Sequence, residues 1–138
     1  STGPRTEMRW ESNWTSGDHL WEADVKIRPG TQGTCIMQVK TNAGGEAMYL
    51  ETHNHGNLYN SVDTPVAANL WGVWFHLDVS FDPTTHIGRV WVNNHLALTV
   101  HYDQLPGATW YFKNGTYGII GSESEAHFRN IEFFRSTR

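Results

Sequence analysis

Apolar and polar residues alternate with a period of two along most of the chain, the pattern of strands with one buried face. The alternation is longest over residues 71–81, where apolar side chains are separated by Gly72, Trp74, His76, Asp78 and Ser80. Gly, Pro, Asn and Asp interrupt it about every eight to twelve residues, as in β-sandwiches. No segment has the helical period of about 3.6 residues, so the pattern predicts an all-β chain.

Strands are expected over 4–10, 20–28, 34–41, 47–53, 58–62, 71–81, 87–92, 96–101, 110–117 and 126–134, with a loop at 63–69. About ten strands in one domain, residues 1–138, predict two sheets packed face to face in a jelly-roll or concanavalin-like sandwich. Such sandwiches often curve, and we expect the concave face of one sheet to form a sugar-binding groove.

The segment 110–117 is the centre of the expected groove. If it is a strand, Tyr111, Lys113 and Tyr117 share one face, and Gly115 leaves a gap among them. The aromatic residues at 110 and 112 point the other way, into the core. A phenol and an ammonium beside bare backbone form a surface suited to a polar ligand.

Three other strands present polar side chains of the same kind. The first carries Arg5, Glu7 and Arg9, the third Gln38 and Lys40, and the fourth Tyr49, Glu51 and His53. We predict that these rows line the same shallow groove and contact a sugar chain. Aromatic rings stack on sugar faces, and the candidates for stacking are Tyr49, Trp14 and Trp74.

The composition limits the classes of partner that the chain is expected to bind. The chain has 138 residues, seven Trp and a formal net charge of −4, so it has no general basic field for nucleic acid. No apolar run approaches the roughly 20 residues that cross a membrane. The single cysteine, Cys35, excludes an intrachain disulfide, and its place in an apolar alternation predicts a buried small hydrophobe.

No cofactor and no metal site are expected. His53 and His55 are two residues apart on a turn with no evident third ligand for zinc. A structural Ca²⁺ site at Asp18, Asp63 or Asp82 remains an alternative, although nothing in the sequence specifies it. Glycosylation sequons begin at Asn13 and Asn114 and point to a secreted, extracellular protein.

Three segments together resemble the alginate lyases of polysaccharide lyase family seven. Arg5-Thr-Glu-Met-Arg9 resembles the family's Arg-x-Glu-Leu-Arg strand, and Ile36-Met-Gln-Val-Lys40 resembles its Gln-Ile/Val-His strand. Tyr111-Phe-Lys-Asn-Gly-Thr-Tyr117 resembles its Tyr-Phe-Lys-Ala-Gly-x-Tyr strand, and the order along the chain matches. The glucuronan lyases of family twenty are an equally similar group.

The resemblance implies a β-jelly roll that cleaves a uronic-acid polymer, alginate or glucuronan, by β-elimination. It implies that Tyr117 delivers and removes protons, that Gln38 with Arg5 or Arg9 neutralises the substrate carboxylate, and that Lys113 contacts sugar. The chain departs from the family because Lys40 stands where the family has His, which removes one base but keeps a cation near Tyr117. The chain is also shorter, and an uncovered sheet edge would favour a homodimer.

Two alternatives remain open. The first is a lectin that binds glycans in the same groove without cleaving them. The second is a lyase that draws its base from His19 on another strand. Glycoside hydrolysis, which needs two carboxylates at a fixed separation, is disfavoured because no strand has the Glu-x-Asp-x-x-Glu pattern of the family-sixteen type.

Overall fold

The computed structural model describes residues 5–9, 13–103, 107–118 and 124–135. The side chains of Arg5, Thr6, Glu7 and Tyr117 lie outside this description. These residues form eleven strands and one short 3₁₀ turn, η1 (Asn54–Gly56). The strands are β1 (Arg5–Arg9), β2 (His19–Ile27), β3 (Thr34–Thr41), β4 (Glu46–Thr52), β5 (Leu58–Asn60), β6 (Thr64–Ala67), β7 (Trp74–Asp82), β8 (Ile87–Val92), β9 (His95–His101), β10 (Trp110–Gly118) and β11 (Ala126–Arg135). No helix in the described part of the chain is long and apolar enough to span a bilayer.

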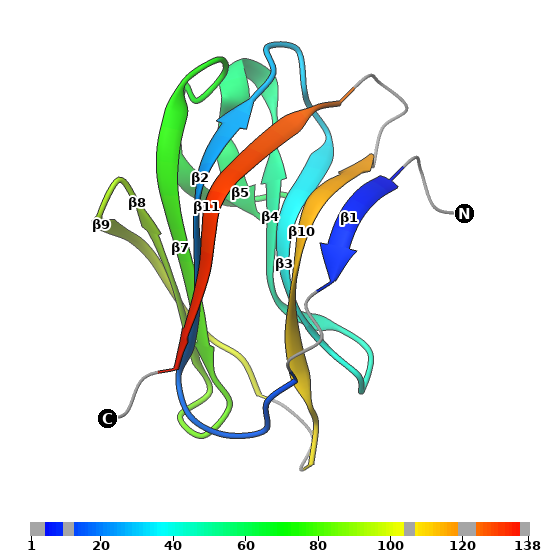
Figure 1. Cartoon of the computed structure of the whole chain (residues 1–138), viewed down its shortest axis with the longest axis vertical. Coiled ribbons are helices and arrows are strands. Elements are labelled where there is room, and N and C mark those ends of the chain that lie inside the picture. Colours follow the sequence, from blue (N-terminus) through cyan, green and yellow to red (C-terminus); the bar gives the residue numbers. More distant parts are fainter. Residues whose placement is uncertain (1–4, 10–12, 104–106, 119–123, 136–138) are drawn as a thin grey trace.

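The strands build two antiparallel sheets that face each other (Figure 1). One sheet has six strands in the order β1-β10-β3-β4-β5-β6, and the other has five in the order β11-β2-β7-β8-β9. Strands from opposite ends of the chain are neighbours, since β1 pairs with β10 and β11 pairs with β2. The expected all-β sandwich is confirmed. Pairing with a second copy through an edge strand stays a prediction.

The core lies between the sheets and is rich in aromatic side chains. Trp110 of the six-stranded sheet and Phe81 of the five-stranded sheet are both 0% exposed, and their ring centroids lie 4.4 Å apart. Trp21 of β2 is also fully buried. Burying an aromatic side chain of this size is worth roughly 1.5–3 kcal/mol. The core therefore supplies the main attraction between the two sheets.

The prediction for residues 71–81 is wrong at its start. The strand begins at Trp74, because Gly72 has φ +71° and its N–H donates to the carbonyl of Ile27 at 2.8 Å. A residue with positive φ breaks the pleat, so the alternation before Trp74 does not define a strand face. Val73, expected in the core, is 52% exposed.

The loop expected at 63–69 contains strand β6, which pairs with β5. Pro65 favoured the loop, because proline has no N–H to donate to a ladder. Since β6 is the last strand of its sheet, one side of it needs no donor, and proline is tolerated there.

A bulge in β3 turns Ile36 into the core, although strict alternation along 34–41 predicts that Ile36 faces outward together with Gln38 and Lys40. Cys35 pairs with Glu51 and Met37 pairs with Leu50, so β3 has one residue more than β4 over this interval. The extra residue is Ile36, which is 1% exposed and belongs to the core. Cys35 is buried, as expected. A bulge shifts the alternation of inward and outward side chains by one position. The sequence pattern alone does not show where such a bulge occurs.

A Gly56→Ala substitution tests the turn that leads into β5. Gly56 has φ +71°, and an added Cβ would lie 2.4 Å from the backbone nitrogen of Trp71. Gly30 is the matched control, because it has φ +94° but no atom within 4 Å of an added Cβ. Both substitutions should cost roughly 1–2 kcal/mol for the positive φ, and Gly56→Ala should cost about 1–3 kcal/mol more because backbone must move. Urea unfolding measures both, and equal losses would contradict the close contact at Gly56.

Candidate functional site

Four side chains lie on one line across neighbouring strands of the six-stranded sheet. Arg9 of β1 pairs with Lys113 of β10, Lys113 pairs with Gln38 of β3, and Gln38 pairs with Tyr49 of β4. Residues directly opposite each other in antiparallel strands point to the same face. We call these four residues the polar row. Segments far apart in the sequence are thus brought together, as the sequence analysis expected.

A second line of residues runs beside the polar row. Tyr111 pairs with Lys40, and the Arg9 guanidinium carbon lies 3.8 Å from the centre of the Tyr111 ring. This cation–π contact directs Arg9 along the sheet face. Lys40 Nζ lies 3.8 Å from Glu46 Oε2, and both side chains are partly exposed. Glu46 therefore offsets part of the charge that Lys40 was expected to offer a substrate.

The polar row combines cationic groups with a carboxamide. Gln38 is 4% exposed, Lys113 is half-buried and Arg9 is exposed. Guanidinium and ammonium groups donate strong hydrogen bonds to carboxylates, and a carboxamide donates as well. Chemically, the row can hold a carboxylate and neutralise its charge.

Glu51 of β4 and His53, which follows the end of that strand, form a pair. Oε1 of Glu51 lies 2.8 Å from Nε2 of His53, and the Glu51 side chain is 3% exposed. His53 packs its ring edge-on against Tyr59, with centroids 5.1 Å apart. Of the two predicted sugar contacts, Glu51 is thus enclosed and orients the imidazole, while His53 remains open to solvent.

The positions of Arg5, Glu7 and Tyr117 are described only by their backbone. Arg5 pairs with Tyr117, Glu7 with Gly115, and Tyr117 with Cys35. Their side chains lie outside the described residues, so the proposed proton transfer by Tyr117 stays a prediction. The groove expected over this sheet also stays a prediction.

Two expected stacking residues do not lie with the polar row. Trp14 is 6% exposed and packs on Phe112, with centroids 4.6 Å apart, so it belongs to the core. Trp74 lies on β7 of the other sheet, with the Arg129 guanidinium carbon 3.8 Å from its ring centre. Of the three candidates, only Tyr49 is in the row.

His19 is wrong as a substitute base for this face. It lies on β2 in the five-stranded sheet, where its ring stacks on Trp14 at 4.7 Å. Its Nδ1 lies 3.1 Å from the Gly17 carbonyl, to which it can donate. The ring is therefore fixed at the end of the core, on the sheet opposite the polar row.

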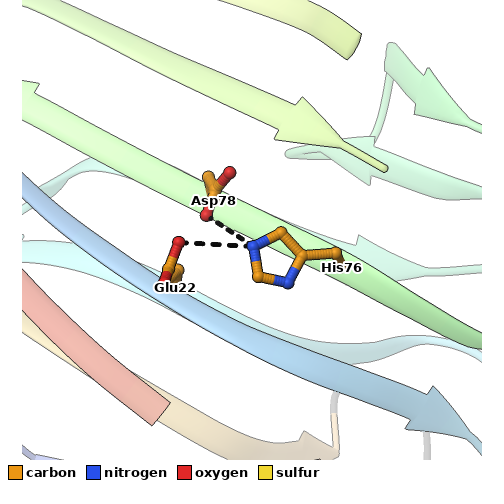
Figure 2. Close-up of side chains that lie close together, drawn as sticks. All are labelled: Glu22, His76 and Asp78. Atoms are coloured by element: carbon orange, nitrogen blue, oxygen red, sulfur yellow. Dashed lines mark hydrogen bonds and ion pairs between the residues drawn. The ribbon is translucent and has the colours of Figure 1, made fainter. Parts of the chain in front are cut away.

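The outer face of the five-stranded sheet holds a cluster that the sequence analysis missed. Nε2 of His76 lies 3.3 Å from Glu22 Oε2 and 3.1 Å from Asp78 Oδ1 (Figure 2). Its Nδ1 lies 2.9 Å from Asp24 Oδ1. In the sheet, Glu22 pairs with Asp78 and Asp24 pairs with His76. The alternation of 20–28 and 71–81 put these residues on outward faces, but only the pairing of β2 with β7 joins them.

The residues of this cluster shift one another's pKa values. The hydrogen bond to Asp24 raises the pKa of His76, and the hydrogen bond from His76 lowers the pKa of Asp24. Burial, followed by the neighbouring Glu22, raises the pKa of Asp78 to about 6. Three carboxylates thus surround one imidazole.

No protein-family model matches the chain. Its sequence is 29% identical over 140 residues to a protein of Hevea brasiliensis named citrate-binding protein. The match covers 98% of this chain and 58% of that protein. The chain therefore spans less than two thirds of the length of this curated relative.

Solved structures of alginate lyases have the same fold. The family 7 alginate lyase AlgAT5 aligns with a TM-score of 0.77 and 20% identity, over 96% of this chain and 70% of that one. An alginate lyase of Pseudomonas aeruginosa gives a TM-score of 0.75 and 19% identity, over 96% and 75%. Alginate lyase AlyC3 in complex with dimannuronate gives 0.68 and 13%, over 94% and 70%. At these identities the likeness shows the jelly-roll sandwich alone.

The environment of His19 predicts a pH dependence of stability. Burial is the main cause that lowers its pKa below 6.5, against the opposing effect of the Gly17 carbonyl. Below pH 6.5 the unfolded chain then binds the proton more readily than the folded one. The free energy of unfolding should therefore fall, relative to that of a His19→Gln variant, as the pH drops below 6.5 toward the folded-state pKa. Urea unfolding of both proteins across this range measures the difference, and parallel curves would contradict it.

Proposed function

We propose that this chain is a carbohydrate-active protein that binds a uronic-acid polymer of the alginate or glucuronan type on its six-stranded sheet. The observation that carries the proposal is the polar row, which aligns Arg9, Lys113, Gln38 and Tyr49 across four strands. A uronate presents one carboxylate per sugar, and a row of cations and a carboxamide suits that chemistry. The shared fold with alginate lyases, one of them in complex with dimannuronate, supports the choice of substrate class.

The reaction proposed for this face is β-elimination. Cations and the Gln38 amide bind the uronate carboxylate, which makes the C5 proton more acidic. A base takes that proton, the electron pair forms the C4–C5 double bond, and the C4–O bond breaks. The leaving oxygen takes a proton from an acid. Tyr117 is the proposed acid and base, provided that neighbouring cations lower its pKa from about 10.

Two features bear on the strength of catalysis. Lys40 replaces the histidine of the family that the chain resembles, and Glu46 offsets its charge. Arg9 and Lys113 are in register with each other on the sheet that also carries Tyr117, and we propose that they keep this face cationic. We therefore assign Arg9 and Gln38 to carboxylate binding, Lys113 and Tyr111 to sugar contact, and Lys40 to a supporting charge.

A Tyr117→Phe substitution tests the reaction. The wild-type chain should release unsaturated ends from alginate or glucuronan, and the variant should lose at least about 100-fold in rate, because general acid–base catalysis contributes 10²–10⁴-fold. Ultraviolet absorbance of the unsaturated product measures both. Tyr102→Phe is the matched control, since Tyr102 packs edge-on against Trp110 in the core and should leave the rate unchanged.

Equal rates for wild-type and Tyr117→Phe would overturn the assignment of Tyr117. Binding of the polymer to the wild-type chain with no unsaturated product would favour a lectin on the same face. In that case an Arg9→Gln change should still weaken binding, because Arg9 is proposed to contact the carboxylate in a lectin as well as in a lyase.

A second candidate is a binding site for a small polycarboxylate such as citrate. The 29% identity to a protein named citrate-binding protein favours it. Citrate and uronate share the carboxylate, so the polar row is the proposed site for either ligand. For citrate we propose binding at the polar row without a reaction, so under this candidate the chain is a binding protein.

Calorimetry with citrate tests the second candidate. Arg9→Gln should weaken citrate binding about tenfold or more, since a hydrogen bond to a charged group is worth roughly 1.5–3 kcal/mol. Arg28→Gln is the charge-matched control, because Arg28 follows β2 in the other sheet and lies 3.7 Å from Glu125. Citrate affinity that is unchanged by Arg9→Gln would exclude the polar row as its site.

We also propose an extracellular location and a single domain over residues 1–138. Asn13 of the first sequon is exposed, which supports access to a glycosylating enzyme. Asn114 of the second sequon is 4% exposed within β10 and is not accessible in the folded chain. Of the two sequons, only the one at Asn13 therefore supports the proposed extracellular location.

A further inference from the structure

We propose that Glu22, His76 and Asp78 bind a divalent transition-metal ion, with Zn²⁺ the best fit, on the outer face of the five-stranded sheet. One atom from each residue, a carboxylate oxygen or an imidazole nitrogen, lies within 4.8 Å of the other two. The site lies on the sheet opposite the polar row, so the proposal is independent of the proposed function.

Two of the three distances between the donor atoms match those around a shared ion, and the third, between the two carboxylate oxygens, is within 4.8 Å. Zinc binds nitrogen and oxygen ligands at about 2.0–2.2 Å in a tetrahedral arrangement, which puts neighbouring donors about 3.3 Å apart. His76 Nε2 lies 3.3 Å from Glu22 Oε2 and 3.1 Å from Asp78 Oδ1. No side chain has to move far for all three to reach one ion.

Hydrogen bonding alone leaves one of these atoms unsatisfied. Nε2 of His76 carries at most one hydrogen, and Glu22 Oε2 is its acceptor. Asp78 Oδ1 is shielded from solvent and, among the described residues, receives no well-formed hydrogen bond, although His76 Nε2 lies 3.1 Å away. A buried carboxylate oxygen without a donor is costly, whereas an ion between the three atoms satisfies all of them at once. The ion also separates two carboxylates that otherwise repel each other.

The other ring nitrogen of His76, Nδ1, contacts a carboxylate, as is common for metal-binding histidines. Nδ1 of His76 lies 2.9 Å from Asp24 Oδ1, so a hydrogen on Nδ1 leaves the Nε2 lone pair directed at Glu22 and Asp78. Asp24 is itself fixed, because Asn130 Nδ2 donates to its Oδ2 at 2.9 Å. This chain of contacts orients the ring and makes it a better ligand.

The donor set also selects the kind of ion and leaves room for a fourth ligand. Ca²⁺ takes six to eight oxygen ligands, whereas one imidazole and two carboxylates suit zinc with one open position. A hollow of about 430 Å³ lies beside Asp78, lined also by Leu20, Ser80, Trp91 and Phe134. We assign the open position to water or a small anion that enters from this hollow.

Calorimetry of the EDTA-treated, dialysed chain with ZnCl₂ tests the site. We expect one ion per chain and a higher midpoint of thermal unfolding with zinc, because the ion binds the folded state. His76→Gln and Glu22→Gln should each weaken binding at least tenfold. Asp24→Asn should weaken it about 10–100-fold through the loss of its support for the ring. His127→Gln is the matched control, because it removes another histidine beside a carboxylate, Glu125, on the same sheet.

Zinc affinity of His76→Gln or Glu22→Gln equal to that of the wild type would overturn the site, as would the absence of stoichiometric binding. An Asp24→Asn variant with wild-type affinity would overturn the supporting role of Asp24. Binding of CaCl₂ as tightly as ZnCl₂ would overturn the choice of ion. Circular dichroism of each variant checks its fold, and Glu22→Gln serves if His76→Gln does not fold. Polymer cleavage and citrate binding are separate measurements, so failure of this site leaves the polar row untouched.

Discussion

The contact between Trp110 and Phe81 joins the two sheets of the sandwich across the core. Each ring comes from a different sheet and each is fully buried, with 4.4 Å between their centroids. Because apolar side chains on alternate positions of each strand must reach this core, the intervening positions are turned outward. The two outer faces, and all the polar chemistry on them, exist because the inner faces are packed together.

The polar row and the cluster around His76, on opposite sheets, carry opposite chemistry. The six-stranded sheet aligns Arg9, Lys113, Gln38 and Tyr49, a set rich in cations and donors. On the five-stranded sheet Glu22, Asp24 and Asp78 surround His76, a set rich in acceptors. The first face suits an anionic ligand and the second a cation. A net charge of −4 for the whole chain conceals this separation.

Irregular positions decide which residues share a face. The bulge at Ile36 sends that side chain into the core and keeps Cys35 in register with Glu51. A second register shift, between Asn114 and Tyr117, allows Tyr117 to pair with Cys35 while β1 continues in register on the other side. Without these two shifts, the rows near the end of β10 would not line up across the sheet.

The all-β class, most strands and the outward placement of the polar row could be predicted from the sequence, because these follow from a local period of two. The sequence also predicted that strands near residues 5, 38 and 113 meet, through their resemblance to a known family. Tertiary structure alone decided the bulge at Ile36, the burial of Trp14 and the cluster around His76. Each of these depends on which strand lies beside which and in what register, and pairing between distant segments leaves no local pattern in the chain.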